Sequence, residues 1–290
     1  MTTRIGLIGN DIATSLSPAL HANEASTHGI VDYRYELIDL PSDADAGAAL
    51  LNAVADGYVG FNITHPFKQA VLTTLDGISD EAAALGAVNT VVVDGGKLLG
   101  HNTDYTGFRT ALTTGLTGVA LGRVTLVGAG GAGSAVAFAL AHSGVRHLTI
   151  ADVDAARAAA LAERVSTAGS QPAGATASVD SIALADLAAS LEQSDGLVNA
   201  TPVGMVGHPG TPVSADLVRP SHWVADIIYR PLYTELICHA EQLGCRVLDG
   251  GQMLVAQAAA SFDLLTGRHA DLDRMRTHLE ELVSARTVAA

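Results

Sequence analysis

A glycine loop between two apolar runs constrains the fold of this chain more than any other feature. The loop, 128–133, follows the strand-like run 124–127 and leads into a stretch of small residues, 134–142, that is typical of a helix. A second apolar run, 147–151, ends on Asp152. Strand, tight turn, helix, strand and acid in this order indicate a dinucleotide-binding unit, in which glycines let the backbone approach a pyrophosphate and the helix offers it N–H groups. The alternative is a glycine-rich helix end or an ordinary tight turn.

The acid that closes the second apolar run bears on the choice of cofactor. A carboxylate at this position can hydrogen-bond both ribose hydroxyls of NAD, and it would repel the 2′-phosphate of NADP. We therefore expect NAD as the cofactor, with Asp152 on the ribose. The candidate contacts in the loop itself are Gly128, Ala129, Gly130, Gly131, Ala132 and Gly133.

Composition excludes several classes of protein. Hydrophobic residues make up 48% of the 290 residues and charged residues 16%, which is typical of a soluble globular protein with an ample core. No apolar run reaches the ~18 residues that a membrane span needs, and the N-terminus enters a strand-like segment directly, so we expect a cytoplasmic protein. A net charge of −14 and only 4% aromatic residues argue against a nucleic-acid partner. Cys238 and Cys245 lack metal or redox spacing and are expected to be free thiols.

Alternating strand-like and helical stretches predict an α/β protein with two domains. In the first, a Gly-Gly turn at 95–96 predicts a hairpin in a sheet that is otherwise mostly parallel. Its expected strands are 4–8, 33–38, 58–63, 88–93 and 97–100, with helices at 18–28, 44–56 and 67–75. Six further strands predict a doubly wound, Rossmann-type dinucleotide-binding domain, at 124–127, 148–151, 175–179, 197–199, 223–226 and 246–248. Residues 168–174 are expected to form a surface loop.

The C-terminal forty residues contain helical patterns only. The stretches 253–266 and 272–283 are expected to be helices that pack back on the first domain and make it discontinuous. The predicted domains are thus 1–105 with 250–290, for the substrate and the chemistry, and 106–249, for the dinucleotide.

A basic residue stands at one predicted strand end of the first domain. The segment Asn-Ile-Thr-His-Pro-Phe-Lys, 62–68, joins a strand to an expected helix, which would place Lys68 one turn into that helix. Carboxyl ends of strands are where α/β sheets bind ligands. Asp104 follows another strand end, and a lysine and an aspartate that converge there form an acid–base pair. The alternative for Lys68 is a solvated helix lysine.

Eight short segments in order resemble the shikimate dehydrogenase family along nearly the whole chain. They are 15–18 (Ser-Leu-Ser-Pro), 62–68, 86–90, 102–104, 128–133, 199–205, 226–231 and 250–257. The resemblance implies hydride transfer between the nicotinamide and C3 of shikimate or quinate, with Lys68 and Asp104 as the catalytic dyad. It places the substrate on Ser15, Ser17, Thr64, Asn89, Tyr229 and Gln257. It places the cofactor on the glycine loop and beside Thr201, Pro202, Met205 and Gly250.

Two departures from the usual family pattern favour a catabolic, NAD-dependent quinate/shikimate dehydrogenase. Biosynthetic members usually carry an Asn-Arg-Thr-like segment for the 2′-phosphate, where this chain has Asp152-Val153-Asp154 with Arg157 one turn later. Arg157 could still contact the adenine or a phosphate. Thr14 stands where a histidine is common, and its smaller hydroxyl side chain could bind the additional hydroxyl of quinate.

Three other functions remain open at this stage. Within the enzyme class they are a biosynthetic, NADP-dependent shikimate dehydrogenase of the aromatic amino acid pathway and an amino-shikimate variant. From another class comes a non-catalytic sensor of quinate, which would not need Lys68, Asp104 and an intact glycine loop together. The expected partners are the small-molecule substrate and cofactor, with no nucleic acid, membrane or metal, in a monomer or a homodimer.

Overall fold

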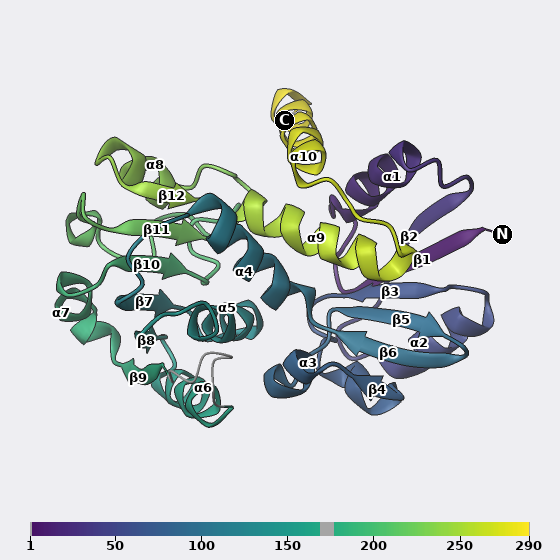
Figure 1. The fold of residues 1–290 in the computed structure, drawn as a ribbon, viewed down its shortest axis with the longest axis horizontal. Helices are drawn as coiled ribbons and strands as arrows, with labels where there is room; N and C mark the ends of the chain where they lie inside the picture. The colour runs from purple at the N-terminus through teal and green to yellow at the C-terminus, as the bar shows by residue number, and fades with distance from the viewer. Residues whose placement is uncertain (1, 169–176, 290) are drawn as a thin grey trace. The chain divides into compact units, whose positions relative to one another are not determined.

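The chain forms two compact units, each with its own six-stranded sheet (Figure 1). The structure is a computed structural model that describes residues 2–168 and 177–289. One unit comprises Met1–Thr103 with Val255–Ala290, and the other comprises Asp104–Leu254. The chain passes between the units in two helices, α4 (Thr103–Gly115) and α9 (Gly250–Thr266).

The sheet of the first unit is mostly parallel, as the sequence predicts. Its strand order is β2-β1-β3-β5-β6-β4, and only β5 runs opposite to its neighbours. The strands are β1 (Thr3–Gly9), β2 (Tyr33–Asp39), β3 (Gly60–Ile63), β4 (Gly77–Ile78), β5 (Thr90–Asp94) and β6 (Lys97–His101). The helices are α1 (Ser17–Thr27), α2 (Ala46–Ala55), α3 (Asp80–Leu85) and the 3-10 helix η1 (Ala70–Thr74). A core around Phe61 and Phe67 fills the space between the sheet and α2.

The predicted hairpin is present between β5 and β6. Gly95 and Gly96 form its two-residue turn with φ of 56° and 80°. Positive φ at both positions is what a turn of the hairpin type needs, and glycine adopts it without a steric penalty. The hairpin makes β5 antiparallel to β6.

The second unit has the strand order of a dinucleotide-binding domain. All strands are parallel, in the order β12-β11-β10-β7-β8-β9, which Figure 1 shows from top to bottom. In chain order this is 6-5-4-1-2-3, the doubly wound arrangement of a Rossmann fold. The strands are β7 (Arg123–Val127), β8 (His147–Ala151), β9 (Ser178–Ile182), β10 (Gly196–Asn199), β11 (Trp223–Asp226) and β12 (Arg246–Leu248). The helices are α5 (Gly131–Ala141), α6 (Ala155–Thr167), α7 (Leu187–Glu192) and α8 (Glu235–Gln242), with 3-10 turns η2 (Leu184–Asp186) and η3 (Ala215–Leu217).

Two local predictions are wrong. The segment 67–75 is no α-helix: turns over 65–69 precede the short η1, so Lys68 lies in a turn and not one turn into a helix. The strand predicted at 175–179 is β9, at Ser178–Ile182, because pairing with β8 fixes its register from Ser178 onward. The helix α3 and the strand β4 were not predicted. The surface loop expected at 168–174 falls, from residue 169 on, outside the described residues.

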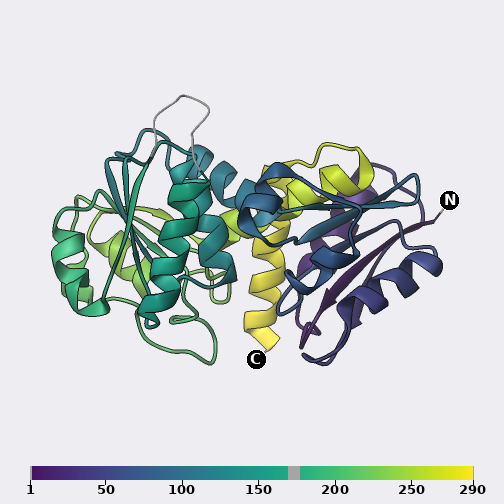
Figure 2. The same ribbon diagram turned by 90° about the horizontal axis from the view of Figure 1, so that it is seen from below.

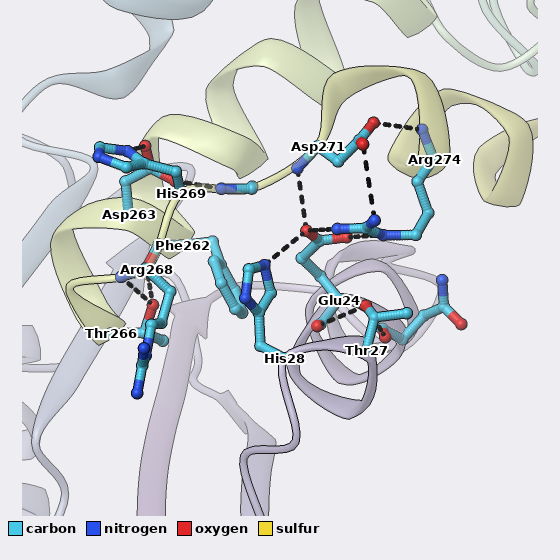
Figure 3. Close-up of polar contacts among 12 residues, drawn as sticks. Glu24, Thr27, His28, Phe262, Asp263, Thr266, Arg268, His269, Asp271 and Arg274 are labelled. Carbon is cyan, nitrogen blue, oxygen red and sulfur yellow. Dashed lines mark hydrogen bonds and ion pairs between the residues drawn. The ribbon is translucent and has the colours of Figure 1, made fainter.

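A buried carboxylate fastens the C-terminal helix α10 (Leu272–Ala289) to α1 (Figure 3). Glu24 of α1 is fully buried and accepts hydrogen bonds from Arg274 Nε at 2.9 Å and from the Asp271 N–H at 2.9 Å. Its carboxylate also meets His28 Nε2 at 3.2 Å. Burial raises the pKa of Glu24, but the hydrogen bonds from Arg274 and Asp271 outweigh it, so the pKa lies below its usual value. Both ribbon views show α10 beside α1 (Figure 2).

Candidate active site

The ends of β3 and β6 and the start of β5 bring polar residues to one edge of the first sheet. The Ile63 N–H donates to the Asn89 carbonyl at 2.8 Å, and the Asn89 N–H donates to the His101 carbonyl at 3.0 Å. Because β5 is antiparallel to both neighbours, its first residues lie next to the last residues of β3 and β6. Thr64, Asn89 and Thr103 therefore meet at this edge.

Lys68 is held at the same edge by its main chain. Its carbonyl accepts a hydrogen bond from the Val88 N–H at 2.9 Å, directly before Asn89, and its side chain is half-buried. The Phe67 N–H donates to the Thr64 carbonyl at 2.9 Å, which closes the turn that carries the lysine. A long-range hydrogen bond, and not helix geometry, thus positions Lys68.

Asn89 is buried and its side-chain oxygen is surrounded by donors. The Thr103 N–H lies 2.6 Å from Oδ1, the Thr103 hydroxyl 3.1 Å and the Thr90 hydroxyl 3.2 Å. The Thr103 hydroxyl also lies 3.5 Å from Oε1 of Gln257, on α9. Asn89 and Gln257, both predicted from the sequence, therefore belong to one cluster. Asp104 comes directly after Thr103, in the first turn of α4.

Ser15 and Ser17, at the start of α1, help to begin the helix and are also partly exposed to solvent. Ser15 Oγ accepts a hydrogen bond from the Ser17 N–H at 3.2 Å, which satisfies one donor at the start of the helix. Both serines are half-buried, whereas Thr14 is exposed. The Ser17 side chain is hydrogen-bonded to Tyr35, a half-buried phenol whose pKa is raised by desolvation.

The glycine loop of the second unit has the geometry that a pyrophosphate site needs. Gly128 has φ of 107°, and a Cβ there would lie 2.6 Å from the Ala200 carbonyl oxygen. A Cβ on Gly133 would lie 2.1 Å from the Gly128 oxygen, so glycine lets α5 approach the loop. A Cβ on Gly130 or Gly131 would meet nothing within 4 Å, which leaves open space at the start of α5. These are the three tasks of the fingerprint glycines: a tight turn, access for the pyrophosphate and close helix packing.

Asp152, directly after β8, holds the loop from the other side. It is nearly buried; its Oδ2 accepts from the Ala129 N–H at 2.7 Å and its Oδ1 from the Asp154 N–H at 2.8 Å. Arg157 lies 3.2 Å from Asp152 and 4.0 Å from Asp154, so two carboxylates face this guanidinium.

The remaining predicted cofactor residues lie after β10 and at the start of α9. The Thr201 hydroxyl donates to Asn199 Oδ1 at 2.7 Å, and the Met205 N–H donates to the Pro202 carbonyl at 3.0 Å. A Cβ on Gly250 would lie 2.2 Å from the Ile228 carbonyl oxygen, so the backbones touch there. Met205 is 38% exposed. Tyr229 is half-buried after β11 in this second unit, not in the unit that holds the other predicted substrate residues.

Comparison with known proteins assigns the family. A family model described as the shikimate dehydrogenase substrate-binding domain matches residues 7–91, and one described as the shikimate 5'-dehydrogenase C-terminal domain matches 250–280. A ThiF family model matches 106–166, the part with the glycine loop. A protein of Pseudarthrobacter chlorophenolicus named shikimate dehydrogenase (NADP(+)) is 49% identical over 99% of this chain and 97% of its own.

The chain belongs to the shikimate dehydrogenase family. A quinate/shikimate dehydrogenase (NAD(+)) of Corynebacterium efficiens is 45% identical over 94% of this chain and 95% of its own. The solved structure of quinate dehydrogenase from Corynebacterium glutamicum in complex with NAD superposes with a TM-score of 0.91 at 41% identity, covering 97% of this chain and 99% of that one. The predicted two-domain α/β fold with a Rossmann-type domain is confirmed.

This family member contains supporting residues that the sequence did not single out as functional. Asn199 Nδ2 donates to Asp226 Oδ1 at 3.1 Å, and the Thr234 hydroxyl donates to Asp226 Oδ2 at 2.8 Å. Burial raises the pKa of Asp226, although these hydrogen bonds oppose the shift. Asn199 and Asp226 lie inside two of the family segments, which was the one available signal. Together they join the loop after β10 to the loop after β11.

The described part of the chain shows neither a metal-binding cluster nor a membrane-spanning helix. In 2–168 and 177–289, no group of three or more His, Cys, Asp or Glu side chains could hold a metal ion. No helix within the same ranges is long and apolar enough to cross a membrane. Both cysteines are free thiols, and Cys245 is buried.

Proposed function

We propose that this protein is a dehydrogenase that oxidises the C3 hydroxyl of shikimate or quinate with NAD and catalyses the reverse reduction. The observation that carries the proposal is the cluster in the first unit, where Lys68 is anchored next to buried Asn89 and Gln257 joins through Thr103. A polyhydroxylated carboxylate needs many polar partners, because a buried hydroxyl without one is costly. Relatives of similar length carry the matching names.

The proposed chemistry needs a group that moves the hydroxyl proton. A nicotinamide dinucleotide supplies the acceptor for the hydride. We assign proton transfer to Lys68, whose neutral amine takes the proton during oxidation and whose ammonium returns it during reduction. Asp104, directly after Thr103, is assigned to orient that amine. The substrate's carboxylate and remaining hydroxyls are assigned to Ser15, Ser17, Thr64, Asn89, Tyr229 and Gln257, with Thr14 beside the additional hydroxyl of quinate.

We propose NAD as the preferred cofactor on the evidence of Asp152. Its carboxylate is fastened to the glycine loop through Ala129, so it cannot easily swing away from an incoming ribose. Fixed negative charge there favours ribose hydroxyls and opposes a 2′-phosphate. Arg157 faces two carboxylates, which supports the same preference. The NADP-dependent biosynthetic enzyme is the second candidate, because the 49% identical relative carries that name.

Replacement of Lys68 tests the assignment of the catalytic base. We expect Lys68→Ala to lower kcat by about 10²-fold or more while the substrate still binds, since only proton transfer is lost. The chain has one other lysine, Lys97, which is exposed in the β5–β6 hairpin. Lys97→Ala is the matched control and should retain full turnover. Equal kcat for the two variants would remove Lys68 from the mechanism.

A further inference from the structure

Asn62, at the end of β3, is the centre of a buried hydrogen-bond network under the candidate site. Its side chain is 8% exposed. Its Oδ1 accepts from the Tyr35 hydroxyl at 2.8 Å. Its Nδ2 lies 2.7 Å from the Ser261 hydroxyl, 3.0 Å from the Thr90 hydroxyl and 3.2 Å from the Asn89 carbonyl oxygen. One carboxamide thus connects β2, β3, β5 and α9.

One arm of this network reaches the start of α1. Tyr35 uses its proton on Asn62, so its oxygen is available as an acceptor, and the Ser17 side chain is hydrogen-bonded to it. The Ser17 hydroxyl is therefore connected to Asn62 through a single half-buried phenol.

The other arm reaches Asn89 and Gln257. The Asn62 amide donates to Thr90, which leaves the Thr90 hydroxyl proton for Asn89 Oδ1 at 3.2 Å. With Thr103 donating to the same oxygen, Asn89 has its acceptor end turned into the protein, and we assign its amide nitrogen to the ligand. The direction of donation along Asn62, Thr90 and Asn89 is therefore set by the Asn62 carboxamide.

We propose that Asn62 is a positioning residue that fixes the donor and acceptor pattern which Ser17 and Asn89 present to the polyhydroxylated substrate. This inference rests on the proposed function for the identity of the ligand. Asn62 itself is turned into the protein on both ends of its carboxamide, so it acts through its neighbours. Its loss removes the acceptor of the Tyr35 hydroxyl and the amide at Ser261, whereas the Asn89 carbonyl keeps the Ile63 N–H at 2.8 Å.

The decisive experiment compares kinetics and stability in matched variants. Asn62→Leu keeps the shape and removes both polar ends, and Thr90→Val interrupts only the arm to Asn89. Thr125→Val is the control: Thr125 is fully buried in β7 of the second unit and its hydroxyl is bonded to Ser190 and Ser194 at 2.8 and 2.7 Å. We expect KM for shikimate and quinate to rise about tenfold or more in the first two variants, with KM for NAD changed by less than about twofold. Thr125→Val should lower the Tm without changing the substrate KM.

Two additional measurements separate positioning from general destabilisation. Thr90→Ser keeps the hydroxyl and should restore the substrate KM. Thr90→Val combined with Asn89→Ala should be no worse than Asn89→Ala alone, because Thr90 acts through Asn89. Two results would overturn the proposal. One is a substrate KM in the double variant that rises by the product of the two single-variant factors. The other is an equal rise in KM for substrate and for NAD in Asn62→Leu or Thr90→Val.

A spectroscopic readout keeps the test independent of activity. The side-chain amide resonances of Asn89 should shift in Thr90→Val and remain in place in Thr125→Val. Unshifted resonances in Thr90→Val would overturn the positioning role. A wild-type protein that oxidises neither substrate would refute the proposed function alone, and the resonances would still decide the role of this network.

Discussion

Replacement of Gly133 by alanine should damage the second unit in a way that the loop geometry allows us to estimate. The added Cβ would lie 2.1 Å from the Gly128 oxygen and 2.9 Å from the Gly128 carbonyl carbon, both backbone atoms. The start of α5 must therefore move by roughly 1 Å to restore van der Waals contact. Overpacking of this kind costs about 3 kcal/mol, and the better helix propensity of alanine returns about 1 kcal/mol.

A net loss of about 2 kcal/mol corresponds to a Tm lower by roughly 4–8 °C for a unit of this size. Urea unfolding followed by tryptophan fluorescence measures the loss directly, because the single tryptophan, Trp223, is buried in β11 of the same unit. NAD should also bind about tenfold more weakly, since the displaced N–H groups of α5 are the proposed pyrophosphate contacts.

Gly131→Ala is the matched control for this effect on stability. Its Cβ would meet nothing within 4 Å, and the residue already begins α5. Its unfolding free energy should stay within about 0.5 kcal/mol of the wild type. If Gly133→Ala unfolds at the same urea concentration as Gly131→Ala, the close approach of α5 to the loop does not exist as described.

Two further predictions concern charged groups. Asp152→Asn should shift the ratio of kcat/KM for NAD over NADP toward NADP by about tenfold. Asp154→Asn removes the same charge at an exposed helix cap and should shift this ratio by less than about threefold. An unchanged ratio in Asp152→Asn would contradict charge repulsion. Glu24 has a lowered pKa, so its contribution to stability is present above about pH 4.5 and is lost as the pH falls through the lower, folded-state pKa. Glu24→Gln should therefore lower the Tm at pH 7 by roughly 2–6 °C, and the difference in Tm from the wild type should narrow below about pH 4. Glu280→Gln, in an exposed ion pair, should leave the Tm unchanged. A difference in Tm for Glu24→Gln that does not depend on pH would contradict this account.

Local sequence signals predicted the scaffold of the cofactor site well. The three glycines, the strand before them and the acid after the next strand all lie within the 30 consecutive residues 123–152 of one unit, and their spacing alone encodes the turn. The hairpin at Gly95 and Gly96 was predictable for the same reason. In these places the conformation depends on neighbours in the chain.

The substrate side depended on contacts between distant residues and was harder to predict. Pro66 and Phe67 look like the start of a helix, but the Val88 N–H captures the carbonyl of Lys68 and holds the segment in turns. Asn62 bonds to Ser261, 199 residues away, and no local pattern contains that pairing. Tyr35 lies in β2, and the residue pattern of that strand does not predict its hydrogen bond with Ser17. On the substrate side, the sequence therefore predicted which residue types are present, but not the hydrogen bonds that orient their side chains.

The most direct test of the account is the initial rate of NAD(P)H formation with quinate and with shikimate, each with NAD and with NADP, at saturating and limiting cofactor. The account predicts oxidation of both substrates, with kcat/KM for NAD exceeding that for NADP by about tenfold or more. Oxidation of shikimate alone, with NADP preferred, would contradict the roles given to Asp152 and Thr14 and would favour the biosynthetic enzyme. No turnover with any of the four pairs would refute the dehydrogenase itself.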